Sequence, residues 1–139
     1  MNVHYGHLIR ILHWCTDQTM TDALNKLNLT AAQGRLMAFV VHRGEQPTYA
    51  KDVEAELHLT HPTVSGLLSR LEQKGFVEGF GDPADRRVKL VRITAAGEAC
   101  CRQAERNMEQ TEANLLSGLT ETERSIFLTL LKKVRDTLQ

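Results

Sequence analysis

The chain has 139 residues, with 17 basic and 17 acidic side chains that give a formal net charge of zero. Its length suits one domain with a real core, and no stretch approaches the roughly 20 apolar residues that span a bilayer. Polar residues interrupt any apolar run near the start, which argues against a signal peptide, and three cysteines in an unsecreted chain are most simply reduced thiols, so we expect a cytoplasmic protein.

Two helices are expected in the first third of the chain. Apolar residues recur at helical spacing from about residue 3 to residue 27, and Asn28 and Leu29 then break this first helix. The segment Thr30-Ala-Ala-Gln33 has the capping-box pattern, so a second helix should begin there. Its body, residues 35–42, is nearly all apolar and should be buried.

Two shorter helices follow a loop that contains Gly44 and Pro47. We expect Thr48 to cap the first of them, and the second to lie within the segment THPTVSGLLSRLEQKG and to end at Lys74 and Gly75. The second helix has one apolar face, made by Val64, Leu67, Leu68 and Leu71. Its opposite face is small, polar and uncharged and holds Pro62, Ser65, Gly66, Ser69 and Gln73, with Arg70 on the flank. Another surface can therefore approach this helix closely.

A hairpin is expected next, because residues 76–80 and 88–93 are rich in strand-forming side chains. The turn is given by Gly81, Asp82 and Pro83, and Asp85-Arg86-Arg87 stands at its end. Two helices followed by a hairpin with a basic tip describe a winged helix-turn-helix. In such a domain the second helix enters the major groove of DNA and the hairpin reaches the backbone or the minor groove.

The last part of the chain predicts two more helices. Thr94 can cap a long, rather polar helix that runs to about Gly118. A second capping box, Thr120 with Glu123, opens a final helix whose apolar face is wide for the end of a small chain. This face could pack on the first helix of the same chain or on a second copy of the chain.

The segment LEQKGFVEGFGDPADRRVKLVRIT, residues 71–94, resembles the signature of the MarR family of bacterial transcriptional regulators. In that family a helix ending in Leu-Glu-x-x-Gly leads into a wing of the form Asp-x-Arg-x5-(Leu/Ile)-Thr, then two residues and Gly. Those wing positions are here Asp85, Arg87, Ile93, Thr94 and Gly97. The order of the other segments fits the same family over nearly the whole chain.

The resemblance implies a mainly α fold with a small β-hairpin wing (α+β), forming a single MarR-type domain over residues 1–139. Residues 30–94 would be the winged helix-turn-helix lobe, with the helix-turn-helix at about 49–74 and the wing at about 76–94. Residues 1–29 and 95–139 would be dimerisation helices, so the resemblance favours an intertwined homodimer over packing within one chain.

The function implied is that of a sequence-specific DNA-binding regulator, a dimeric repressor on a near-palindromic operator that a small-molecule or stress signal releases. The neutral net charge leaves open a winged-helix module that binds protein instead. Residues 60–94 nevertheless hold six basic against four acidic side chains, and a local basic patch is what docks on phosphates. An enzyme is not expected, and we predict no cofactor, because the sequence has no nucleophile–base set or phosphate loop.

Candidate DNA contacts follow from these positions. Ser65 and Ser69 can hydrogen-bond base edges, and Pro62 can press on a thymine methyl. Gly66 stands where relatives often carry arginine, which removes a guanine reader. By resemblance, Arg87 enters the minor groove and Asp85 holds its guanidinium. The full predicted set is His61, Pro62, Thr63, Ser65, Gly66, Ser69, Arg70, Asp85, Arg86, Arg87 and Lys89, of which His61, Thr63, Arg86 and Lys89 are expected to meet phosphates.

An effector pocket is a further expectation, since many relatives bind aromatic acids between the dimer helices and the winged lobe. A pocket for a small aromatic or phenolic molecule would be lined by Arg10, His13, Trp14, Met37 and His42, whereas ordinary core packing is the alternative role of each single residue. No histidine pair has metal-ligand spacing, so no metal site is predicted. Cys15 lies about two helical turns later than the peroxide-sensing cysteine of some relatives, so we do not expect it to sense peroxides.

Overall fold

The computed structural model describes residues 4–139. In this part of the chain six helices and three short strands follow one another. They are α1 (Tyr5–Asn25), α2 (Ala31–Arg43), β1 (Thr48–Tyr49), α3 (Ala50–Leu57), α4 (His61–Gln73), β2 (Val77–Gly81), β3 (Lys89–Ile93), α5 (Ala95–Leu115) and α6 (Glu121–Thr137). The predicted mainly α fold with a β-hairpin is confirmed. None of the helices between residues 4 and 139 has both the length and the apolar content needed to cross a membrane.

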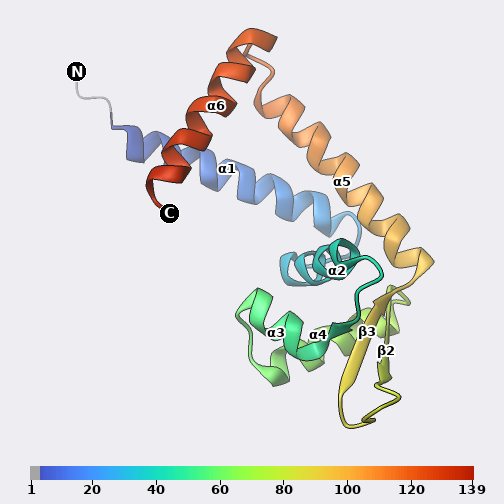
Figure 1. Ribbon diagram of the computed structural model, residues 1–139. Helices are drawn as coiled ribbons and strands as arrows, with labels where there is room; N and C mark the ends of the chain where they lie inside the picture. Colours follow the sequence, from blue (N-terminus) through green and yellow to red (C-terminus); the bar gives the residue numbers. More distant parts are fainter. Residues whose placement is uncertain (1–3) are drawn as a thin grey trace.

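The chain folds as a small lobe that carries three long helices. Elements α2 to β3 gather at the bottom of Figure 1, while α1, α5 and α6 extend away from them. The hydrophobic core lies mainly in the lobe, where Leu36, Met37, Val53, Leu68 and Leu71 are almost completely buried. In contrast, no side chain of α6 is fully buried.

Side-chain caps explain where α2, α5 and α6 begin. The Thr30 hydroxyl accepts from Gln33 N at 3.2 Å, and the Gln33 side chain accepts from Thr30 N at 3.1 Å, which completes the predicted capping box. Thr120 and Glu123 form the same pair at the start of α6. The Thr94 hydroxyl accepts from Gly97 N at 3.0 Å, so the predicted cap of α5 is also confirmed.

Helix ends agree less well with the prediction. The first helix ends at Asn25, and Asn28 takes a left-handed conformation (φ 58°) in the turn before α2. Its expected start at residue 3 lies outside the described residues. The long helix α5 ends at Leu115 instead of reaching Gly118. The end of α4 is as expected: Lys74 follows its last residue, and Gly75 has φ 76°.

The expected cap at Thr48 is wrong. Thr48 and Tyr49 form a third strand, antiparallel to β3 with Thr48 opposite Val91, and the sheet order is β1-β3-β2. Tyr49 is therefore the residue that precedes α3, and its backbone N–H donates to Asp52 Oδ2 at 2.8 Å. A strand of two residues is too short to show an alternating pattern, which is why the sequence predicted only a two-stranded wing.

Gly97 in the first turn of α5 packs directly on backbone. A Cβ at this position would overlap the carbonyl oxygen of Phe76 and lie 2.7 Å from Ile93 Cδ1. That carbonyl cannot easily move away, because it accepts the backbone N–H of Thr94 at 3.0 Å. Overpacked sites of this kind cost about 1–3 kcal/mol.

Gly97→Ala is accordingly expected to lower the free energy of unfolding by about 1–3 kcal/mol, measured by urea denaturation at one protein concentration. Gly118→Ala is the matched control, because a Cβ there meets no atom within 4 Å. Equal stability of the two variants would show that the junction between β3 and α5 is looser than the structure indicates.

Candidate nucleic-acid interface

One face of α4 packs in the hydrophobic core and the other is exposed. Val64, Leu67, Leu68 and Leu71 are buried, as their spacing predicts. The predicted contact residues on the other side are all exposed: His61, Pro62, Thr63, Ser65, Gly66, Ser69 and Arg70. A Cβ added at Gly66 would meet nothing within 4 Å, so no internal packing requires glycine there. The helix thus presents an uncovered surface of small side chains.

The first turn of α4 is pinned to the helix before it. Nδ1 of His61 lies 2.6 Å from Glu54 Oε1 on α3, and the hydroxyl groups of Thr60 and Thr63 are 2.9 Å apart. This turn contains no acidic side chain, and no side chain caps it. Exposed backbone N–H groups at a helix start favour an anion such as a phosphate. The Nδ1 atom of His61 is already engaged by Glu54 at this place.

The wing tip is an ordered turn. The Asp82 side chain accepts from Ala84 N at 3.0 Å, and the backbone N–H of Val88 donates to Asp85 O at 2.9 Å. Arg87 makes a bidentate pair with Asp85, in which Nε donates to Oδ1 at 3.1 Å and Nη2 donates to Oδ2 at 3.3 Å. These hydrogen bonds from Arg87 lower the pKa of the Asp85 carboxyl. The predicted ion pair is confirmed, and the Arg87 side chain is 92% exposed.

Lys89, which the sequence predicts to meet a phosphate, is paired with an acidic side chain in this structure. Its ammonium is 3.1 Å from Glu72 Oε1 on α4. Gly79 makes room for this bridge, since a Cβ there would lie 2.5 Å from Glu72 Oε1 and 3.0 Å from Lys89 Nζ. The bridge joins the wing to the last turn of α4. The sequence could not show this, because it depends on how the strands pack across the helix.

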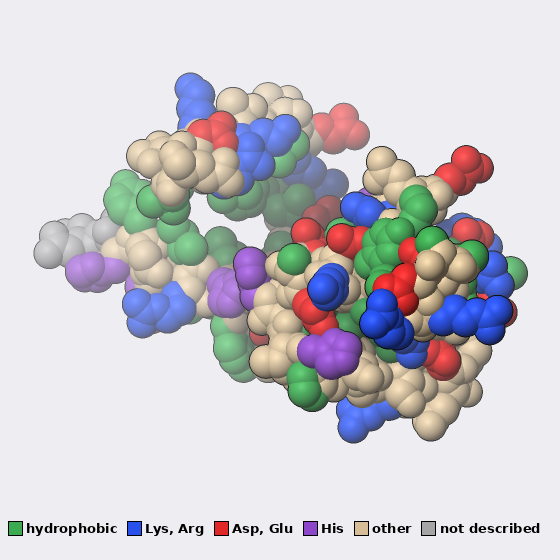
Figure 2. All heavy atoms as spheres, turned by 60° about the horizontal axis from the view of Figure 1, so that its bottom comes forward, with side chains coloured by type: hydrophobic (Ala, Val, Ile, Leu, Met, Phe, Trp, Pro, Cys, Tyr) green, Lys and Arg blue, Asp and Glu red, His purple; other side chains and the backbone are tan. Residues whose placement is uncertain are grey.

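Not all the basic charge of this region is free. Arg92 on β3 pairs with Glu78 at 2.7 Å and lies over the Phe80 ring, 4.8 Å from its centroid. Between residues 4 and 139, Arg70 and Arg86 form no ion pair. Basic and acidic side chains lie intermingled on the lobe surface in Figure 2, and no large uniform patch is seen on that face.

A groove between α3, α4 and the wing contains residues that the sequence pattern did not single out. It encloses about 450 Å³ and is lined by Tyr49, Ala50, Lys51, Asp52, His61, Arg87, Val88 and Lys89. Lys51 is exposed there, so it adds a basic group between the first turn of α4 and the wing tip. The Tyr49 hydroxyl donates to Asp82 Oδ2 at 3.3 Å, and the negative charge of Asp82 raises the pKa of Tyr49.

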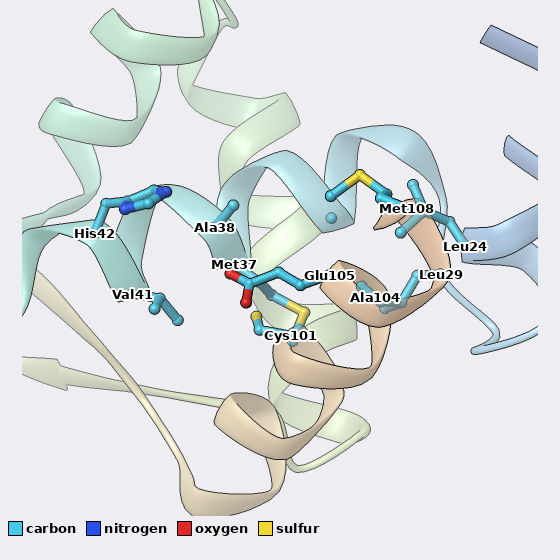
Figure 3. A pocket seen from close by; sticks show the side chains of 11 residues that line it. Leu24, Leu29, Met37, Ala38, Val41, His42, Cys101, Ala104, Glu105 and Met108 are labelled. Carbon is cyan, nitrogen blue, oxygen red and sulfur yellow. The ribbon is translucent and has the colours of Figure 1, made fainter. Parts of the chain in front are cut away.

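Within residues 4–139, the residues predicted to line an effector pocket lie in different places. Met37 and His42 line a cavity of about 140 Å³ between α2 and α5, where side chains of α5 reach toward α2 (Figure 3). His13 lines a separate apolar groove between α1 and α6. Arg10 and Trp14 are exposed on α1, Trp14 by 64%, and line neither space. The sequence alone gave no sign that these residues of α1 lie apart from Met37 and His42.

The two cysteines of α5 are poorly suited to act as nucleophiles or redox sensors. Burial raises the pKa of Cys100, and burial together with neighbouring negative groups raises the pKa of Cys101 to about 11. Both thiols are therefore protonated near neutral pH, and the protonated thiol is the unreactive form. Cys101 lines the cavity beside Met37, where it acts as a small apolar wall.

The chain is similar to known regulators over almost its whole length. Residues 27–88 match the model of the MarR family. The chain is 30% identical over 130 residues to the multiple antibiotic resistance protein MarR of Escherichia coli strain K12, covering 93% of this chain and 89% of that protein. The structure of MepR, a transcription regulator of the Staphylococcus aureus multidrug efflux pump MepA, has a TM-score of 0.89 at 26% identity, covering 99% and 100% of the two chains. A MepR point mutant from S. aureus bound to an oligodeoxyribonucleotide has a TM-score of 0.78 at 27% identity, with the same coverage. The chain therefore belongs to the MarR family of transcriptional regulators.

Proposed function

We propose that this DNA-binding transcriptional regulator acts as a homodimer that represses transcription from a near-palindromic operator. The observation that carries the proposal is the free outer face of α4 beside the exposed Arg87 at the wing tip. A helix with small side chains fits the major groove closely, and an arginine at a hairpin tip fits a narrow minor groove. The MepR relative bound to an oligodeoxyribonucleotide supports this reading.

The division of labour within the chain follows the same proposal. Residues 30–94 would contact DNA, while residues 1–29 and 95–139 would join two chains. Base edges would be read by Ser65, Ser69 and the flanking Arg70, with Pro62 and Gly66 allowing close approach. Phosphates would be met by Arg86, Thr63 and the backbone at the start of α4, to which we add Lys51. Such a protein works where the chromosome is, so we place it in the cytoplasm.

The alternative of a winged-helix module that binds protein instead of DNA finds no support in the relatives named above. Members of this family are regulators of transcription and not enzymes. The zero net charge still has a consequence for the mechanism. With few free basic groups, non-specific attraction to the DNA backbone should be modest. The preference for the operator over other DNA sequences would then depend on the contacts in the grooves.

The proposal is tested by selecting sites for the full-length protein from a pool of random duplexes. The enriched sequence should be a near-palindrome whose half-sites are about one helical turn apart, since two symmetric recognition helices meet successive major grooves about 34–36 Å apart. Titration of the selected site against a scrambled duplex at several salt concentrations then gives the specificity. Failure to enrich any sequence, with equal binding to both duplexes, would reject operator recognition.

Release of DNA by a small molecule is the second part of the proposal. The cavity between α2 and α5 is apolar apart from His42 and Glu105, and about 140 Å³ holds a single aromatic ring. A carboxylate at its wall disfavours an aromatic acid and favours a neutral phenol. Calorimetry with phenol and benzoate should show tighter binding of phenol, and Glu105→Gln should narrow the difference. Equal binding of both compounds by the unchanged protein would remove this cavity as the effector site.

Lys89 and Arg86 offer a test of which basic groups of the wing reach DNA phosphates. Lys89→Gln should leave the salt dependence of operator binding unchanged, because the lysine is engaged by Glu72. Arg86→Gln should reduce the slope of log affinity against log salt by about one, the effect of losing one phosphate contact. A slope that falls for Lys89→Gln would mean that the bridge to Glu72 opens on DNA.

A further inference from the structure

Lys74, the residue that follows α4, connects the recognition helix to the junction between the first two helices. Its ammonium donates to the carbonyl oxygen of Asn28 and to Gln33 Oε1, the latter at 3.2 Å. Asn28 lies in the turn that leaves α1 and has φ 58°. Gln33 is 3% exposed, and its side chain also completes the capping box of α2. One charged group therefore ties the end of α4 to the α1–α2 junction.

The surroundings of this ammonium indicate a fixed position. The Lys74 side chain is only partly exposed, and its acceptors belong to segments 46 and 41 residues away in the sequence. Helix α5 is also close: burial raises the pKa of Cys100, and the positive charge of Lys74 partly offsets that rise. Hydrogen bonds to a charged donor are roughly twice as strong as neutral ones. The contact thus joins the DNA-reading helix to the turn that follows α1 and to the start of α2, close to α5.

We propose that Lys74 is a positioning residue that fixes the tilt of α4 on the dimerisation helices and thereby sets the half-site spacing that the dimer accepts. The proposal rests on the dimeric operator binding proposed above. Helix α4 has 13 residues, which is about 20 Å at 1.5 Å per residue. Pivoting it by about 10° at the Lys74 end would move its first turn by about 3.4 Å, the rise of one base pair. Without the Lys74 contact, the dimer should therefore accept half-site spacings that differ by about one base pair.

A spacing series tests the proposal with the full-length protein. The selected half-sites are separated by the preferred spacing and by one base pair fewer or more, and affinities are measured for the wild type and variants. Lys74→Met keeps the apolar stem but removes the donors, and Lys74→Arg keeps charge and donors. Lys26→Met is the matched control. This exposed lysine lies in the same turn as Asn28, and its side chain makes no hydrogen bond among the described residues.

The wild type, Lys26→Met and Lys74→Arg should prefer one spacing by about tenfold or more, the scale of one mismatched base pair. Lys74→Met should bind the three spacings within about threefold of each other, with the salt slope unchanged. A sharp preference retained by Lys74→Met overturns the proposal, and a slope reduced by about one overturns it in favour of a phosphate contact. If Lys74→Met does not fold, Lys74→Gln is judged by the same criteria. A wild type that shows no spacing preference would instead reject dimeric operator binding itself.

Discussion

Replacing Leu130 and Val134 together by glutamate is expected to make the protein monomeric and to weaken operator binding by about 10²–10⁴-fold. These side chains on α6 are 52% and 56% exposed in the single chain. They belong to a larger set of exposed apolar residues on α1 and α6: Tyr5, Leu8, Ile9, Ile11, Leu12, Trp14, Ile126, Leu128, Leu130, Leu131 and Val134. Large exposed apolar patches mark interaction sites, so we expect these two helices to join two copies of the chain.

The large size of the effect follows from two costs. Carboxylates cannot be buried in an apolar interface without partners, so the dimer should dissociate. Each recognition helix would then bind its half-site without the effective concentration that a joined partner supplies. The measurement is sedimentation velocity at micromolar concentration, followed by titration of the operator.

The matched control places the same two charges on the polar face of the same helix, as Ser125→Glu with Thr129→Glu. That variant should remain a dimer and bind the operator nearly as well as the wild type. A glutamate variant at 130 and 134 that stays dimeric would show that the other apolar residues suffice. A monomer with undiminished operator affinity would contradict the requirement for two half-sites.

Features that depend on neighbouring residues were predictable from the sequence. The capping boxes at Thr30 and Thr120, the cap at Thr94 and the apolar face of α4 all rest on contacts three or four residues apart, and the structure has each of them. The Asp85–Arg87 fork is also local, with two residues of separation. Family resemblance supplied the reason for expecting it at the tip of a wing.

Features made by distant segments were not predictable in the same way. Strand β1 exists because Thr48 meets Val91 across the sheet, and Lys89 meets Glu72 through packing of β3 on α4. The cavity beside Met37 is closed by α5, whereas Arg10, His13 and Trp14 of α1, which the sequence predicts at the same pocket, do not line it. Local propensity contains no information on such pairings, so these errors concern residues whose partners are far away in the sequence, in addition to the small shifts of the ends of α1 and α5.

Arg87→Ala is expected to weaken specific binding by about 1–3 kcal/mol, the scale of a good arginine contact to DNA. The side chain is exposed, ordered by Asp85, and free to enter a minor groove whose negative potential is increased by narrow A·T steps. Asp85→Ala should cost less, because it removes only the group that orients the arginine. The double variant should then be no worse than Arg87→Ala alone, since the carboxylate has nothing left to position.

Ser69→Ala is the contrasting variant, because it changes the outer face of α4 and leaves the wing intact. It should relax base preference at one operator position while sparing the salt slope, since a hydroxyl contact to a base edge displaces no counterion. All four variants are titrated against one operator at two salt concentrations. Arg87→Ala binding like the wild type at both would mean that the tip never enters the groove. The ordered Asp85–Arg87 pair would then serve only to fold the turn, because its hydrogen bonds to the backbone and side chain are satisfied without DNA.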